Sequence, residues 1–258
     1  MADAIISATG PARRINLDWV PAVYFSPRQI FKLIASQSRA VWLTPLLFMT
    51  LTALILALVS GPARLAAAQS GITLPPDFQN YSPEMQAQTL QAAQVSQGPV
   101  FIYVFPAVLA LGKVWIGWML VGGLLHLVLT LFGGRGNTGA SMNLVAWSAL
   151  PFALRDILRI IVVASTHSLI NNPGLSGFAP TGGRAALFLS KILASFDIYL
   201  VWHVLLLVLG VRLATGLGRG KTWMTVLITI LLGVFLEASS GFLASLLSGM
   251  SVTRPFFF

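Results

Sequence analysis

Residues 40–61 (AVWLTPLLFMTLTALILALVSG) are almost wholly apolar and contain no charged side chain. A run of ~20 apolar residues is the length that a helix needs to cross the hydrocarbon core of a bilayer. Inside lipid, the backbone must satisfy its own hydrogen bonds, which a helix does within one segment. This run therefore predicts a membrane-spanning helix and restricts the fold of the whole chain.

The composition supports a membrane protein and excludes several functions. Of 258 residues, 56% are hydrophobic and 9% are charged, whereas about 25% are charged in an ordinary soluble domain. A soluble fold could not hide so much apolar surface. The chain has no cysteine, which excludes disulfides, cysteine-ligated zinc and thiol catalysis. We interpret the net charge of +9 as an orientation signal and expect no nucleic-acid partner.

Four further apolar segments follow the first, so we predict an all-α membrane protein with a bundle of five transmembrane helices. The helices are expected at about 40–61, 99–132, 140–163, 185–211 and 222–248. They form one domain, 40–248, followed by a tail at 249–258. The N-terminal residues lack a basic region followed by an apolar run, so we expect the first span to direct insertion. In the polar segment after that span, Ser82, Pro83 and Glu84 predict the start of a short helix.

Lys and Arg outside the spans predict the orientation. With the N-terminus in the cytoplasm, nine fall inside and three outside, which is the bias found in membrane proteins. The tail would then lie outside.

Residues 1–39 form a basic segment whose second half predicts an amphipathic helix. Ser26 suits the N-cap and Pro27 the first helical position. At 100° per residue, one stripe carries Arg28, Lys32 and Arg39, and the opposite stripe carries Ile30, Leu33 and Ile34. The three basic residues would contact a lipid surface. Alternatively, the helix packs on the cytoplasmic mouth of the bundle.

Seven charged residues lie within the predicted spans: Lys113, Arg155, Asp156, Arg159, Lys191, Asp197 and Glu237. With a rise of ~1.5 Å per residue, Asp197 and Glu237 fall near the midplane and the others toward the outer leaflet. A charge at the bilayer centre costs at least about 2.5 kcal/mol, and such residues usually face the bundle interior and pair. The set predicts either a structural network that fixes helix register or a polar cavity that binds a solute or a lipid headgroup.

Pro151 removes a backbone hydrogen bond and predicts a kink in the third span, either as part of a site or as simple shape. Small residues recur along the fifth span, where they favour close packing within the bundle or an interface with another helix. These are Ser240, Gly241, Ala244, Ser245 and Ser248. The three histidines have no metal-ligand spacing, and no catalytic motif is present. We therefore expect no metal, no cofactor and no enzymatic activity.

Three segments in order resemble the Yip-domain family of five-helix membrane proteins. The first is YFSPRQIFKLIA with the following Trp42 and Pro45, and the second is GGRGNTGASMNLVAWSALPFAL with its Ser-Ala-Leu-Pro. The third is FDIYLVWHVLLLVLGVRLATGLGRGKTW. The acidic Asp-Leu-Tyr-Gly-Pro segment of eukaryotic members is missing, so the resemblance points to the bacterial branch. It therefore implies a location in the bacterial cytoplasmic (inner) membrane.

This resemblance implies a non-enzymatic protein that organises or assists other membrane components. Its expected partners are membrane lipids and a membrane protein or a second copy of the chain. The alternative is a small transporter or lipid-handling protein that uses the charged residues as its pathway. Loss of transport in an Asp197→Asn variant would favour the alternative, whereas lost stability alone would favour a structural network.

Overall fold

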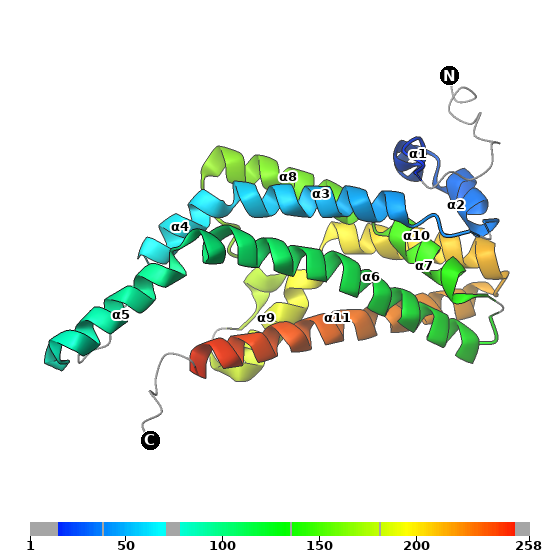
Figure 1. Ribbon diagram of the computed structural model, residues 1–258. Helices are drawn as coiled ribbons and strands as arrows, with labels where there is room; N and C mark the ends of the chain where they lie inside the picture. The colour runs from blue at the N-terminus through cyan, green and yellow to red at the C-terminus, as the bar shows by residue number, and fades with distance from the viewer. Residues whose placement is uncertain (1–14, 38, 71–77, 135, 181, 251–258) are drawn as a thin grey trace. The chain divides into compact units, whose positions relative to one another are not determined.

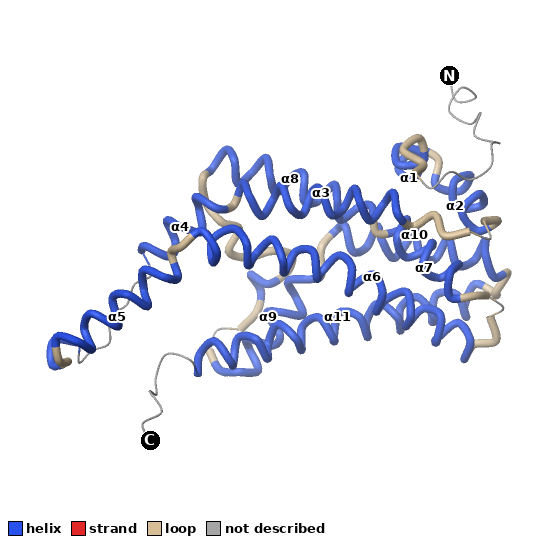
Figure 2. The backbone as a smooth tube through the Cα atoms, in the orientation of Figure 1, coloured by secondary structure: helices blue, strands red, loops and turns tan. Residues whose placement is uncertain are grey.

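A computed structural model describes residues 15–37, 39–70, 78–134, 136–180 and 182–250. Every regular element in these ranges is a helix (Figure 2), which confirms the predicted all-α class. Backbone contacts divide the chain into two compact units. The first comprises Met1–Phe48, Trp115–Phe152 and Asn171–Phe258, and the second comprises Met49–Val114 and Ala153–Ile170.

Three helical segments of the described chain are long and apolar enough to cross a membrane: Val100–Leu131, Ile198–Thr215 and Arg219–Ser239. A fourth is added if α3 (Leu43–Val59) and α4 (Gly61–Ser70), which are bent by 42° at Ser60, count as one broken span. The sequence predicts five, and the predicted span that has no counterpart among these candidates is 140–163.

The helix predicted at 140–163 is interrupted beside Pro151, where the sequence predicts a kink, whereas the helix predicted at 185–211 is wrong as a continuous helix. The first of these segments is divided between α7 (Thr138–Ser148) and α8 (Leu150–Thr166), because Pro151 cannot donate a backbone hydrogen bond. The second is divided between α9 (Gly183–Ser195) and α10 (Ile198–Thr215). There, Phe196 and Asp197 adopt extended backbone conformations, and Asp197 starts the new helix.

The first unit is built around α10 and its neighbours α2, α7 and α11 (Arg219–Met250) (Figure 1). Its core contains large side chains with less than 2% of their surface exposed, among them Phe31, Trp147 and Leu207. Gly210 of α10 allows a close approach, because a Cβ there would lie 2.7 Å from Phe31 and 3.0 Å from Leu144. A small residue at this point lets α2 and α7 pack directly on the backbone of α10.

The N-terminal helices α1 (Trp19–Phe25) and α2 (Pro27–Ala35) belong to this core. Helix α2 begins where the sequence predicts, at Pro27, although the Ser26 side chain makes no capping hydrogen bond. Its buried face consists of Ile30, Phe31 and Ile34 and packs on α10 and α7. The apolar stripe of α2 therefore packs on the bundle, and lipid contact by its basic stripe stays a prediction.

The second unit contains α4, η2 (Phe78–Asn80), α5 (Pro83–Ser96) and the π-helical segment η3 (Val100–Val104). The short helix predicted at Ser82 is confirmed as α5, with the Ser82 hydroxyl accepting from Met85 N at 3.3 Å. The helical conformation of α4 was not foreseen from the sequence. The π-helix leads directly into α6 (Phe105–Leu131), so one helical stretch runs from Val100 to Leu131.

A loop of the first unit folds onto the end of α9. Leu175 N donates to Leu193 O at 3.0 Å, just before the short helix η4 (Ser176–Phe178). Gly174 has a positive φ of 59°, and a Cβ there would lie 2.7–3.0 Å from the carbonyl oxygens of Phe196, Ala194 and Leu193. The loop therefore supplies backbone contacts to carbonyl groups that the interrupted helix leaves at its end.

Candidate functional site

Four of the seven predicted intramembrane charges are close together in the second unit. Asp156 lies on α8 next to Arg155, with Arg155 Nε 3.8 Å from Asp156 Oδ1 and both side chains 15% exposed. Arg159, one turn further along α8, and Lys113 of α6 also lie near enough to act on the charge of the Asp156 carboxylate. Three cations thus surround one carboxylate, an arrangement suited to an ion-pair network or to an anionic group.

The other three predicted charges belong to the first unit. Lys191 of α9 and Glu237 of α11 are exposed, and Asp197 is half-buried. Asp197 is the N-cap of α10, and its Oδ1 accepts a hydrogen bond from Leu200 N at 2.9 Å. A carboxylate at this position also interacts favourably with the positive end of the helix dipole. Asp197 therefore has a structural role that a continuous helix would not have given it.

Arg64 of α4 is a half-buried cation that joins two helical segments. Its Nη1 donates to the carbonyl oxygen of Ala57 at 2.8 Å and to that of Ile102 at 3.5 Å, joining α3 and η3. Directly beside it, a Cβ on Gly61 would collide with the Tyr103 ring. The signal available in the sequence is Gly61-Pro62, since proline is favoured in the first turn of a helix.

The interruption at Pro151 is stabilised by side chains from two other helices. Phe152 N donates to Ala149 O, three residues earlier, whereas a regular α-helix uses the carbonyl four residues earlier. The backbone of Ser148 hydrogen-bonds His203 of α10, and Tyr24 Oη of α1 donates to Leu150 O at 2.9 Å. The Tyr24 ring packs edge-on against Trp202, and Phe152 lies against His203. These contacts from α1 and α10 therefore hold the backbone on both sides of the interruption.

Burial also changes the acidity of Tyr24. Desolvation raises the pKa of its hydroxyl from 10 to about 12. His203 is 3% exposed, and its Nδ1 has no hydrogen-bond partner among the described residues. In the sequence, His203 is a histidine without metal-ligand spacing, and no local pattern indicates a role for Tyr24. Their contacts depend on elements far apart in the chain.

Asn143 of α7 anchors the segment that leads into α3. Its Oδ1 accepts from Val41 N and its Nδ2 donates to Arg39 O, both at 2.9 Å. Trp147 Nε1 donates to Val41 O at 3.0 Å, and Trp42 then packs against Trp115 and Trp118 of α6. These contacts fix the segment between α2 and α3 to α7 and α6.

The remaining predicted residues have simpler positions. Arg28, Lys32 and Arg39 are exposed. The small residues Ser240, Gly241, Ala244, Ser245 and Ser248 lie in α11, but their side chains are outside the described part of the structure. Within the described residues, no three His, Asp or Glu side chains are grouped as metal ligands would be.

Together, the apolar helices and the polar contacts at their interruptions define an all-helical integral membrane protein. The Yip1 domain family matches residues 22–239, which is most of the chain, and the protein belongs to this family. The match includes all three segments on which the resemblance rests. No curated protein and no solved structure matches the chain. The Yip1 family is not a known enzyme family.

Proposed function

We propose that this Yip1-family protein has a non-enzymatic role and organises or assists other components of a bacterial inner membrane. In this proposal the N-terminus is cytoplasmic, and the helices α1 and α2 form a platform for a membrane-protein partner, a second copy of the chain or lipid. The main support is the attachment of this platform. Phe31 and Ile34 are buried in the core, whereas Arg28 and Lys32 remain exposed.

A rigidly attached platform suits recognition better than transport. The α1–α2 pair is held by apolar packing, by the Tyr24–Leu150 hydrogen bond and by the Asn143 contacts to residues 39 and 41. Preorganised surfaces lose less conformational entropy on binding than mobile ones do. The exposed apolar side chains along α11, such as Leu231 and Phe235, provide a second surface for lipid or a partner helix.

The test is native mass spectrometry of the chain, extracted gently from its own membrane. A stoichiometric protein companion, or a defined dimer, is the expected result. A matched extraction of an Arg28→Gln/Lys32→Gln variant would show whether the companion depends on the platform. Recovery of the wild-type chain only as a monomer without a protein companion would contradict the organising role.

The alternative function, a transporter or lipid-handling protein, is supported by the charged group at Lys113, Arg155, Asp156 and Arg159. Cations gathered around a carboxylate within apolar helices mark solute pathways in some membrane proteins. An Asp156→Asn variant would then lose uptake or lipid transfer while keeping its thermal stability. Loss of stability without any change in transfer would assign these residues a structural role.

A further inference from the structure

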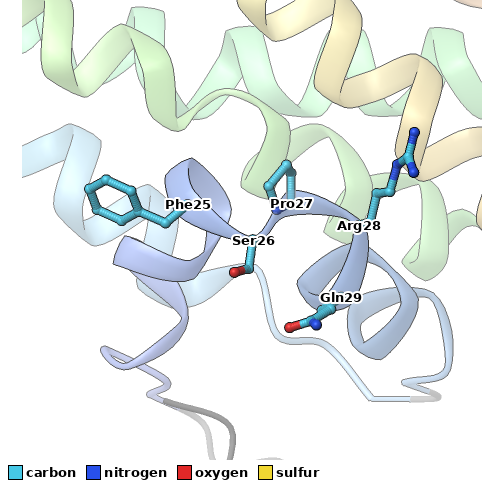
Figure 3. A pocket seen from close by; sticks show the side chains of 5 residues that line it. All are labelled: Phe25, Ser26, Pro27, Arg28 and Gln29. Carbon is cyan, nitrogen blue, oxygen red and sulfur yellow. The ribbon is translucent and has the colours of Figure 1, made fainter. Parts of the chain in front are cut away.

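An open hollow lies where α1 meets α2. It has a volume of about 300 Å³ and is lined by five consecutive residues, Phe25, Ser26, Pro27, Arg28 and Gln29. Figure 3 shows the Phe25 ring and the Arg28 guanidinium directed to different sides of the turn between the two helices. The hollow therefore combines an apolar group and a cation within one short stretch of the chain.

The apolar part of this region is unusually exposed for a helix that belongs to the core. Phe25 is 84% exposed, although Trp19 and Val23 of the same helix are buried. Leu17 and Ile15, just before α1, are 67% and 50% exposed. Such side chains on a segment attached to a membrane bundle are suited to the boundary between lipid headgroups and acyl chains, where apolar groups of surface helices are buried.

The charges of the same segment are complementary to an anionic surface. Arg28 and Lys32 are exposed and lie four residues apart, so they share one face of α2. Between residues 15 and 37 the sequence has one acidic residue, Asp18, against these two cations. Cations near a membrane attract anionic lipids, and a guanidinium binds a phosphate group through two parallel hydrogen bonds.

We propose that this hollow binds the headgroup of an anionic phospholipid. The lipid phosphate contacts Arg28, Lys32 adds a second positive charge, and Phe25 enters the adjacent acyl-chain boundary. The attachment of α2 to the core holds this site in place without the lipid, because Ile30, Phe31 and Ile34 are buried beneath it. The inference rests on the proposed function only in placing this face of the platform against the membrane.

The absence of cysteine in the chain allows a site-specific test. A Gln29→Cys variant carrying an environment-sensitive fluorophore is reconstituted into phosphatidylcholine bilayers. One preparation contains spin-labelled phosphatidylglycerol as the quencher, and a second contains the same fraction of spin-labelled phosphatidylcholine. We expect stronger quenching by phosphatidylglycerol, because its net negative charge favours the site. Equal quenching by the two lipids would overturn the inference.

Variants in the labelled background test the assignment to residues. Arg28→Gln and Lys32→Gln should each reduce the preference for phosphatidylglycerol by roughly fivefold, and Phe25→Ala should reduce quenching by both lipids. The matched control is Arg219→Gln/Lys221→Gln, which removes two exposed cations at the start of α11 and should leave the preference unchanged. A preference that persists in an Arg28→Gln/Lys32→Gln variant would also overturn the inference.

The two proposals fail in distinguishable ways. Loss of the lipid preference while a protein companion is still recovered would contradict the lipid site alone. A lipid preference in a chain that carries no companion would support the site and contradict the organising role. Because the three substituted side chains are exposed, unchanged circular dichroism and melting temperature are expected and serve as the folding control.

Discussion

At the scale of single residues, the packing of α2 on α10 depends on the absence of a side chain at Gly210. Gly210→Ala would force the Phe31 ring or Leu144 to move, since its Cβ would lie 2.7–3.0 Å from both. Overpacking of this kind usually costs about 1–3 kcal/mol. Thermal unfolding in detergent measures the effect.

The control for this substitution is Gly123→Ala in α6, where a Cβ would meet no atom within 4 Å. Alanine in a helix interior is favoured over glycine by roughly 0.5–1 kcal/mol, so this variant should be as stable as the wild type or more stable. Equal stability of the two alanine variants would show that Gly210 does not limit the approach of α2.

Tyr24 predicts a defined response to alkaline pH. The folded chain holds the phenolic proton up to about pH 12, whereas an exposed tyrosine releases it near pH 10. Below pH 10 both states are protonated and the contribution of Tyr24 to stability is complete. Between pH 10 and 12 the unfolded state alone loses the proton, so this contribution decreases as pH rises.

Comparison with Tyr24→Phe isolates this effect. The ultraviolet difference spectrum of wild type minus variant should show one tyrosine ionising near pH 12, and the stability of the wild type should fall toward that of the variant between pH 10 and 12. At neutral pH the variant loses one hydrogen bond, which is worth roughly 0.5–1.5 kcal/mol. Ionisation of the extra tyrosine near pH 10 would show that Tyr24 is solvated.

At the scale of helices, the gap between α9 and α10 allows a test of what Asp197 does. As an N-cap, the residue needs an oxygen that accepts from Leu200 N, and asparagine supplies one. Asp197→Asn should therefore keep most of the stability, whereas Asp197→Ala should lose roughly 0.5–2 kcal/mol.

The two variants distinguish a cap from a charge. A melting temperature that falls equally in Asp197→Asn and Asp197→Ala would mean that the negative charge, and not the hydrogen-bond acceptor, is required. Such a result would support a network in which Asp197 pairs with a cation. Capping by Asp197 would then not be sufficient to explain why α10 begins at Ile198.

At the scale of the whole molecule, five crossings and a cytoplasmic N-terminus predict a labelling pattern. Single cysteines at Ser70 and Asn171, which are both exposed, should react with a membrane-impermeant maleimide added from outside. A cysteine at Ser36, also exposed, should react only after the membrane is opened. Labelling of Ser36 and Asn171 from the same side would exclude this topology.

The sequence by itself determined the class of the protein and several local boundaries. Long apolar runs, scarce charge and three ordered segments lead to an all-helical membrane protein of the Yip1 family, because the cost of exposed backbone in lipid leaves few other folds. Local chemistry also placed the starts of α2 at Pro27 and of α5 at Pro83. Such boundaries depend on residues close together in the chain.

Only the tertiary structure decided where the helices are interrupted and what stabilises the interruptions. Tyr24, Asn143 and His203 satisfy backbone groups that are far from them in sequence, so no local pattern reveals their roles. Hydropathy could not separate α9 from α10, since both helices are apolar. They are separated only by the extended backbone of Phe196 and Asp197. The amphipathic pattern of α2 likewise does not show what its apolar stripe packs against, and the structure buries this stripe against α10.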